Sequence, residues 1–111
     1  MADSILTSVK QHVSLMPEDE SFDEEIISDI NAAFATLTQL GVGPQTGFVI
    51  TGYNETWDDY VVDIVQAQLA QDYVKKTVRA TFDPPSNATV LNKMYEQIAQ
   101  LEWRLKVQAE V

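Results

Sequence analysis

Residues 79–105, with the sequence RATFDPPSNATVLNKMYEQIAQLEWRL, decide how the last two helices of the chain are arranged. Pro84 and Pro85 end the helix that comes before them, because a proline disfavours helical backbone in the preceding residue. Ser86 or Asn87 can then cap a new helix. The apolar residues of this helix recur at intervals of three and four, at Leu91, Met94, Ile98, Leu101 and Leu105. This spacing predicts a narrow apolar seam that packs against one partner helix.

The first part of the chain predicts a short helix at residues 4–14 and a long helix at residues 22–40. The long helix begins at a capping box formed by Ser21 and Glu24, in which each side chain bonds the backbone amide of the other residue. Its apolar residues repeat with the period of a helix. It ends before Gly41, the residue type that most readily takes left-handed backbone after a helix.

A third helix is predicted at residues 57–79, after the capping residue Thr56. Asp58 and Asp59 place negative charge in its first turn, next to the positive end of the helix dipole. Apolar residues occupy most sides of this helix rather than a single stripe. Such a helix is central in a bundle or has a second surface to cover.

Residues 41–55 differ from the rest, because all four glycines of the chain lie there. They also contain the β-branched and aromatic run at residues 48–51, so we expect a Gly-rich loop or a short β-hairpin. A connection of this length in a small domain is often functional. The alternative is an ordinary connection that packs Phe48 and Ile50 onto the bundle.

These elements predict an all-α fold in one domain spanning residues 1–111. We expect a bundle of about four helices, one short and three long, with the last helix at residues 87–107. A chain of 111 residues with 45% hydrophobic residues can bury a single core without disulfides or metals. Global disorder is therefore excluded.

The formal net charge of −10 limits the classes of partner. A surface this acidic repels phosphates and anionic lipids, so it opposes the basic footprint of a nucleic-acid-binding protein. The chain contains no cysteine, which fits a reducing compartment. We expect no signal peptide, because the N-terminus lacks a basic region and a long apolar run. We also expect no contact with a membrane, since no window holds the roughly 20 apolar residues that span a bilayer.

The residues needed for catalysis or metal binding are few. His12 is the only histidine and cannot form a Ser-His-Asp site without a fixed serine nearby, and one imidazole without a thiol does not make a zinc site. The acidic run at residues 18–20 lacks the spacing of an EF-hand, and no phosphate-binding loop is present. The sequence therefore predicts no catalytic residue, no metal and no cofactor, and a protein that is not an enzyme.

Large aromatic residues are numerous for a domain with an adequate aliphatic core: Trp57, Tyr60, Tyr73, Tyr95 and Trp103. Tryptophan, tyrosine and arginine are the residues that most often anchor interfaces between proteins. Trp103 lies off the predicted seam and next to Arg104, which favours contact with another subunit. The alternative is that the aromatic residues complete the core of the monomer.

The chain resembles the head–tail connector proteins, also called adaptor or head-completion proteins, of long-tailed bacteriophages. The resemblance extends from about Ile5 to Leu105. It rests on the order and spacing of five segments: the helix ending in Leu40-Gly41-Val42; Trp57-Asp58-Asp59-Tyr60; Tyr73-Val74 with Lys76 and Arg79; Phe82-Asp83-Pro84-Pro85-Ser86; and Leu101-Glu102-Trp103-Arg104-Leu105.

The resemblance implies a structural virion protein at the phage neck, assembled in the bacterial host cytoplasm. It implies a ring of twelve copies that contacts the portal protein and the next neck or tail-completion protein. DNA passes through such a ring without sequence-specific binding. It also implies that residues 82–85 set the angle between the last two long helices, with Arg79 as an ionic partner of Asp83. The candidate interface residues are Phe48, Ile50, Trp57, Tyr60, Arg79, Phe82, Asp83, Trp103 and Arg104.

The negative charge suits a ring whose lumen repels DNA phosphates, so that a duplex slides through. A competing hypothesis is an acidic inhibitor that mimics DNA and occupies the basic groove of a host DNA-binding enzyme. Its charge fits, but evenly amphipathic helices and surplus aromatic residues fit it less well. A third hypothesis is a metal-dependent enzyme that uses the acidic clusters.

Overall fold

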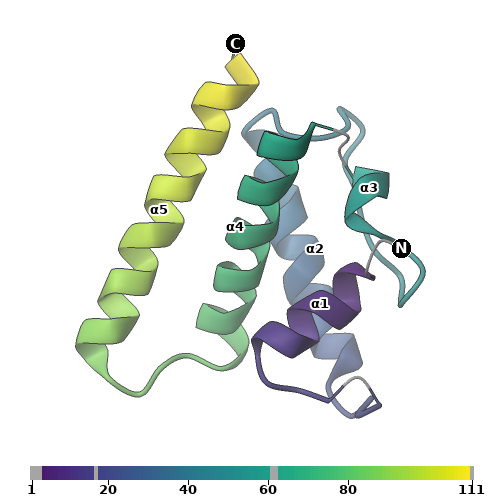
Figure 1. Cartoon of the computed structure of the whole chain (residues 1–111), viewed down its shortest axis with the longest axis vertical. Coiled ribbons are helices and arrows are strands. Elements are labelled where there is room, and N and C mark those ends of the chain that lie inside the picture. The colour runs from purple at the N-terminus through teal and green to yellow at the C-terminus, as the bar shows by residue number, and fades with distance from the viewer. Residues whose placement is uncertain (1–3, 17, 61–62, 111) are drawn as a thin grey trace.

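The computed structural model describes residues 4–16, 18–60 and 63–110, which form a small helical bundle (Figure 1). These residues contain five helices and no strand: α1 (Ile5–His12), α2 (Asp23–Gln39), α3 (Trp57–Tyr60), α4 (Ile64–Phe82) and α5 (Ala88–Glu110). The predicted all-α class is therefore confirmed.

Helix α4 is the centre of the bundle, and it contacts each of the other four helices. Figure 1 shows α5 along one side of α4, with α2 behind it and α1 crossing in front. Ala70, Tyr73, Val74 and Val78 of α4 are all buried and lie on one side of the helix, whereas Val65 is 54% exposed. Helix α5 is the outer layer, and α4 is its main partner.

The single helix predicted at residues 57–79 is instead two helices, α3 and α4. The carboxylate of Asp63 accepts a hydrogen bond from the backbone amide of Gln66 at 2.9 Å and thereby caps α4. Aspartate favours this capping position over a helix interior, because its short side chain bonds nearby backbone amides. Residues 61 and 62, which the prediction placed inside the helix, lie outside the described residues. Helix α4 then continues to Phe82, three residues past the predicted end.

Side-chain caps mark the starts of α1 and α5 but not the start of α2. Asn87 accepts hydrogen bonds from the amides of Thr89 and Val90, as predicted for one of its two candidate caps. The predicted capping box at Ser21 is wrong, since α2 begins at Asp23 without a side-chain cap. The amide of Ser21 donates instead to the carboxylate of Asp19 at 3.1 Å, a local turn that competes with the cap.

The C-terminus of α2 ends in a Schellman motif. Gly41 has a φ of +87°, the amide of Val42 donates to the carbonyl of Leu37, and the amide of Gly41 donates to the carbonyl of Thr38. Val42 and Leu37 are both fully buried, which supplies the hydrophobic contact that accompanies this motif. The helix therefore stops where the sequence predicted.

The segment between α2 and α3 forms no strand among the described residues, so the β-hairpin alternative is not what this chain adopts. Asn31 of α2 fixes it in place. Its side-chain amide donates to the carbonyl of Ile50 at 3.1 Å, and its oxygen accepts from the amide of Ile50 at 2.8 Å. This paired contact satisfies the backbone of Ile50, whose side chain is buried in the core.

A buried lysine joins three parts of the chain that the sequence did not connect. Lys10 of α1 is fully buried, and its ammonium lies 2.8 Å from the carboxylate of Asp23 at the start of α2. It also donates to the carbonyl of Asp19 at 2.6 Å and to the hydroxyl of Tyr53 at 2.7 Å. Tyr53 donates in turn to Asp23 at 2.6 Å. The charge is therefore paired and hydrogen-bonded, as a buried ammonium requires.

Candidate subunit interface

Four of the candidate interface residues pack inside the chain. Phe48 and Tyr60 lie 5.1 and 4.6 Å from Phe34 of α2, measured between ring centroids. Trp57 is buried, and its indole nitrogen donates to the hydroxyl of Ser8 at 3.0 Å. Together with Ile50, these residues form an apolar cluster that joins α1, α2, α3 and the long loop. They give the subunit its core, so the exposed candidates lie elsewhere.

Three further candidates lie at the elbow between α4 and α5. Phe82 is half-buried at the end of α4, and its ring meets Phe22 edge-on at a centroid distance of 5.4 Å. Asp83 is exposed and is the C-terminal cap of α4, and its amide donates the last helical hydrogen bond to the carbonyl of Arg79. The expected ion pair between Arg79 and Asp83 is absent, although both side chains are described. The non-helical backbone of Asp83, with φ −143° and ψ 66°, ends α4 just before Pro84 and without an ion pair.

The remaining two candidates, Trp103 and Arg104, are exposed on the outer face of α5. Trp103 is 66% exposed, the largest exposed fraction among the large hydrophobic residues described. It lies two residues from Leu101 and from Leu105, which places it about 200° around the helix from each of them. Both leucines are buried. Trp103 therefore points away from the core and leaves most of its side chain exposed.

The predicted seam of α5 packs most tightly at its C-terminal half. Leu101 and Leu105 are buried there, whereas Leu91 and Met94 are only half-buried. A hydrogen bond reinforces this half, because the hydroxyl of Tyr73 in α4 donates to the carboxylate of Glu102 at 2.8 Å. Burial, followed by this hydrogen bond and the charge of Glu102, raises the pKa of Tyr73 to about 12.

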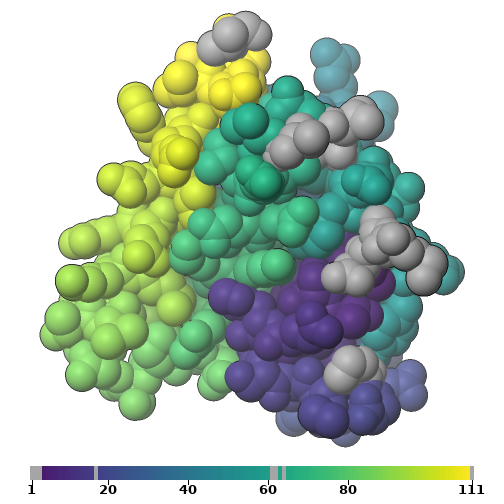
Figure 2. Space-filling view, in the orientation of Figure 1, coloured from purple at the N-terminus to yellow at the C-terminus, as the bar shows by residue number. Residues whose placement is uncertain are grey.

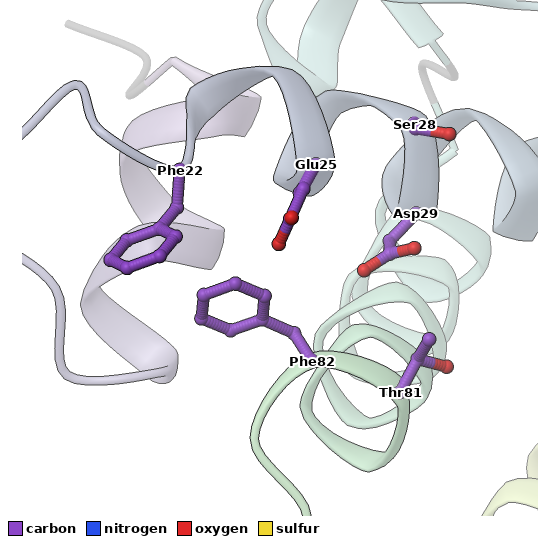
Figure 3. A pocket seen from close by; sticks show the side chains of 6 residues that line it. All are labelled: Phe22, Glu25, Ser28, Asp29, Thr81 and Phe82. Carbon is purple, nitrogen blue, oxygen red and sulfur yellow. The ribbon is translucent and has the colours of Figure 1, made fainter.

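A groove of about 610 Å³ lies where the start of α2 meets the end of α4, and we call it the α2/α4 groove. Figure 3 shows the rings of Phe22 and Phe82 together, with the carboxylates of Glu25 and Asp29 beside them. No described cation pairs with either carboxylate. Burial, with a smaller effect from the charge of Glu25, raises the pKa of Asp29 above its ordinary value. The sequence prediction missed this site. The signal that could have indicated it is the pair Glu25 and Asp29, two like charges four residues apart on a helix without a basic residue.

Negative charge is distributed unevenly along the chain. Residues 1–63 hold twelve of the seventeen acidic residues and one of the seven basic residues, a net charge of −11. Residues 64–111 have a net charge of +1. Helix α5 carries Lys93, Arg104 and Lys106, which form no ion pair with described residues. Figure 2 shows α5 along one edge of the molecule. This edge is nearly neutral, and it carries exposed apolar side chains.

The described residues therefore offer two surfaces suited to contact between proteins: the outer face of α5 and the α2/α4 groove. A comparison with protein families matches residues 5–111 to the family described as phage connector protein. The chain belongs to the phage connector protein family. This family is structural, so the chain is a structural protein of the phage neck that contacts other proteins of the head and tail.

No curated protein and no solved structure matches this connector significantly. Within the described residues, no helix is long and apolar enough to cross a membrane. The same residues contain no group of three or more histidine, cysteine, aspartate or glutamate side chains that could hold a metal ion. The surfaces of the connector are therefore the features from which its function is best argued.

Proposed function

We propose that this connector forms a closed ring of twelve copies at the phage neck, between the portal protein and the next neck or tail-completion protein. DNA passes through the ring during packaging and ejection, and no base sequence is read. The ring assembles in the host cytoplasm and remains in the virion.

One observation carries the proposal: the outer face of α5 is unpartnered in the monomer. Trp103 is 66% exposed there, and Val107 is 40% exposed on the same helix. Tryptophan and arginine anchor interfaces because a large side chain and a planar cation both gain much from being enclosed. Membership of a structural family supports a use of this face in assembly rather than in binding a substrate.

The uneven charge supports two different roles within the ring: the acidic part of the chain faces DNA, and the nearly neutral part contacts the neighbouring subunit. The part of the chain formed by residues 1–63 carries a net charge of −11, so it repels the phosphates of DNA wherever it faces the duplex. The nearly neutral part formed by α4 and α5 can approach a neighbouring subunit without strong repulsion between like charges. Reversal of the carboxylates that line the lumen should slow ejection, and unchanged packaging and ejection would contradict the role given to charge.

Light scattering and negative-stain imaging test the ring directly. The connector is measured alone and after mixing with the portal protein of its own phage. We expect a ring in one of these samples, because a template can trigger assembly of a subunit that is monomeric by itself. A stable monomer or dimer that ignores the portal and blocks a DNA-binding enzyme would support the DNA-mimic hypothesis instead.

A further inference from the structure

We propose that Trp103 and Arg104 of one subunit enter the α2/α4 groove of the next subunit in the ring. This inference rests on the proposed ring and names the contact that closes it. The groove and the outer face of α5 are two different surfaces of the same chain. A contact between them is head-to-tail, the type of interface that generates rings.

The groove has the chemistry to receive an aromatic ring and a cation together. Phe22 is 42% exposed and meets Phe82 edge-on, which leaves aromatic surface open to a third ring. Glu25 and Asp29 lie beside these rings and lack a cationic partner among the described residues. Two carboxylates four residues apart on a helix repel each other, so a positive charge placed between them relieves that repulsion.

The outer face of α5 offers the matching pair. Trp103 and Arg104 are adjacent and exposed, and neither forms a hydrogen bond or ion pair with a described residue. Arginine suits a site with two carboxylates and aromatic rings, because its planar guanidinium bonds carboxylates in pairs and stacks on aromatic faces. The near neutrality of α5 lets it approach the acidic surface around the groove.

Trp103 cannot reach the groove of its own chain. The groove lies at the elbow end of α4, where Phe82 ends that helix. Trp103 lies fifteen residues after Ala88, the first residue of α5, which is about 22 Å along the helix axis away from the elbow. The partner for each half of the contact must therefore come from a second copy of the chain.

Charge reversal on each side of the contact tests the proposal. Arg104→Glu puts a negative charge against the acidic groove, and the paired change Glu25→Lys with Asp29→Lys puts positive charges against Arg104. We expect each variant alone to raise the concentration needed for half-assembly by about tenfold or more, because like charges across an interface are strongly unfavourable. Mixed in equal amounts, the two variants should assemble again, since every contact in an alternating ring then joins opposite charges.

Matched controls separate this contact from a general effect of charge. Lys93→Glu makes the same charge change as Arg104→Glu elsewhere on α5, and Glu24→Lys reverses one carboxylate of α2 outside the groove lining; both should assemble as the wild type does. Circular dichroism of each variant checks that the helices are retained.

A second measurement uses the absence of cysteine in the chain. Glu25→Cys with Arg104→Cys should give a ladder of covalent oligomers when assembled protein is treated with a short bismaleimide, whereas either single cysteine variant should not. A wild-type ring whose assembly is indifferent to Arg104→Glu, or in which Arg104→Cys alone gives cross-linked dimers, overturns this contact and leaves the ring itself intact. A wild type that forms no ring, alone or on the portal, overturns the ring and the contact together.

Discussion

At the scale of single residues, the buried Lys10 is the least expected feature of this connector. A charged group inside a small domain is tolerated only when its partners are fixed. Asp23, Tyr53 and the carbonyl of Asp19 supply those partners from α2, the long loop and the α1–α2 connection. This network therefore joins α1 to α2, to the long loop and to the α1–α2 connection. The spacing of apolar residues along the chain does not predict these contacts.

Removal of Asp23 should destabilise the subunit strongly. Asp23→Ala leaves the ammonium of Lys10 buried with its main counter-charge missing, which costs about 3–5 kcal/mol in comparable buried pairs. Glu24→Ala is the matched control, because it removes an exposed carboxylate from the same first turn. Denaturant titration of both variants measures the difference, and equal unfolding free energies would contradict the importance of the pair.

The same pair predicts how stability depends on pH. Burial raises the pKa of Asp23, but hydrogen bonds from Lys10 and Tyr53 and the charge of Lys10 outweigh it and hold the pKa below the ordinary 3.8. A carboxyl whose pKa is lowered by folding stabilises the native state above its unfolded value, and this contribution is lost as the pH falls through the folded value. The free energy of unfolding should therefore decline below about pH 4, and less steeply in Asp23→Asn.

Lys10 contributes nothing to that acid decline. Burial lowers its pKa, but the hydrogen bonds to Asp23 and Tyr53 and the charge of Asp23 leave it raised above 10.5. Its stabilising effect is fully present below its unfolded value and is lost only at more alkaline pH. Denaturant titrations at several acidic pH values provide the measurement; equal slopes for wild type and Asp23→Asn would contradict the role of Asp23.

At the scale of elements, local sequence rules predicted the helices better than their joints. The apolar spacing of α5, its start at Asn87 and the stop at Gly41 follow from period and capping chemistry that act within a few residues. The break before α4 was missed because the apolar residues continue across it, and only the capping preference of Asp63 marks it. The start of α2 was misplaced because Asp19 takes the amide of Ser21.

The candidate site divides in the same way. The exposure of Trp103 and Arg104 could be predicted from the sequence, because a helical period shows which residues lie off a seam. The α2/α4 groove could not be, since Phe22 and Phe82 are sixty residues apart and meet only when α2 and α4 pack together. Phe48 and Trp57 fit either a core or an interface by residue type, and tertiary packing decided between the two.

The uneven packing of α5 predicts unequal costs along its seam. Leu105 is fully buried, so Leu105→Ala should cost about 2–5 kcal/mol by leaving a cavity between α4 and α5. Leu91→Ala removes the same atoms from a half-buried position near the elbow and should cost clearly less. Thermal or denaturant unfolding compares the two directly; a larger loss at Leu91 would show that the elbow half anchors the helix.

At the scale of the whole molecule, the edge formed by α5 exposes apolar side chains, and the part of the chain before α4 is acidic. Helix α5 packs mainly against α4, on one side, so its outer face is exposed. The acidic residues gather in the part of the chain that precedes α4. We therefore expect stability and assembly to depend on different residues, and a substitution on the outer face should separate them.

The mass of the Trp103→Ala variant after mixing with the portal, measured by light scattering, tests the central claim most directly. Because Trp103 is 66% exposed, the variant should keep its unfolding free energy within about 0.5 kcal/mol of the wild type. Tyr95→Ala, which removes another exposed aromatic side chain from α5, is the matched control and should still assemble. We predict that Trp103→Ala remains a monomer under conditions where the wild type and Tyr95→Ala reach the mass of a closed ring. A Trp103→Ala sample with the same ring mass as the wild type would contradict the claim that the outer face of α5 builds the ring.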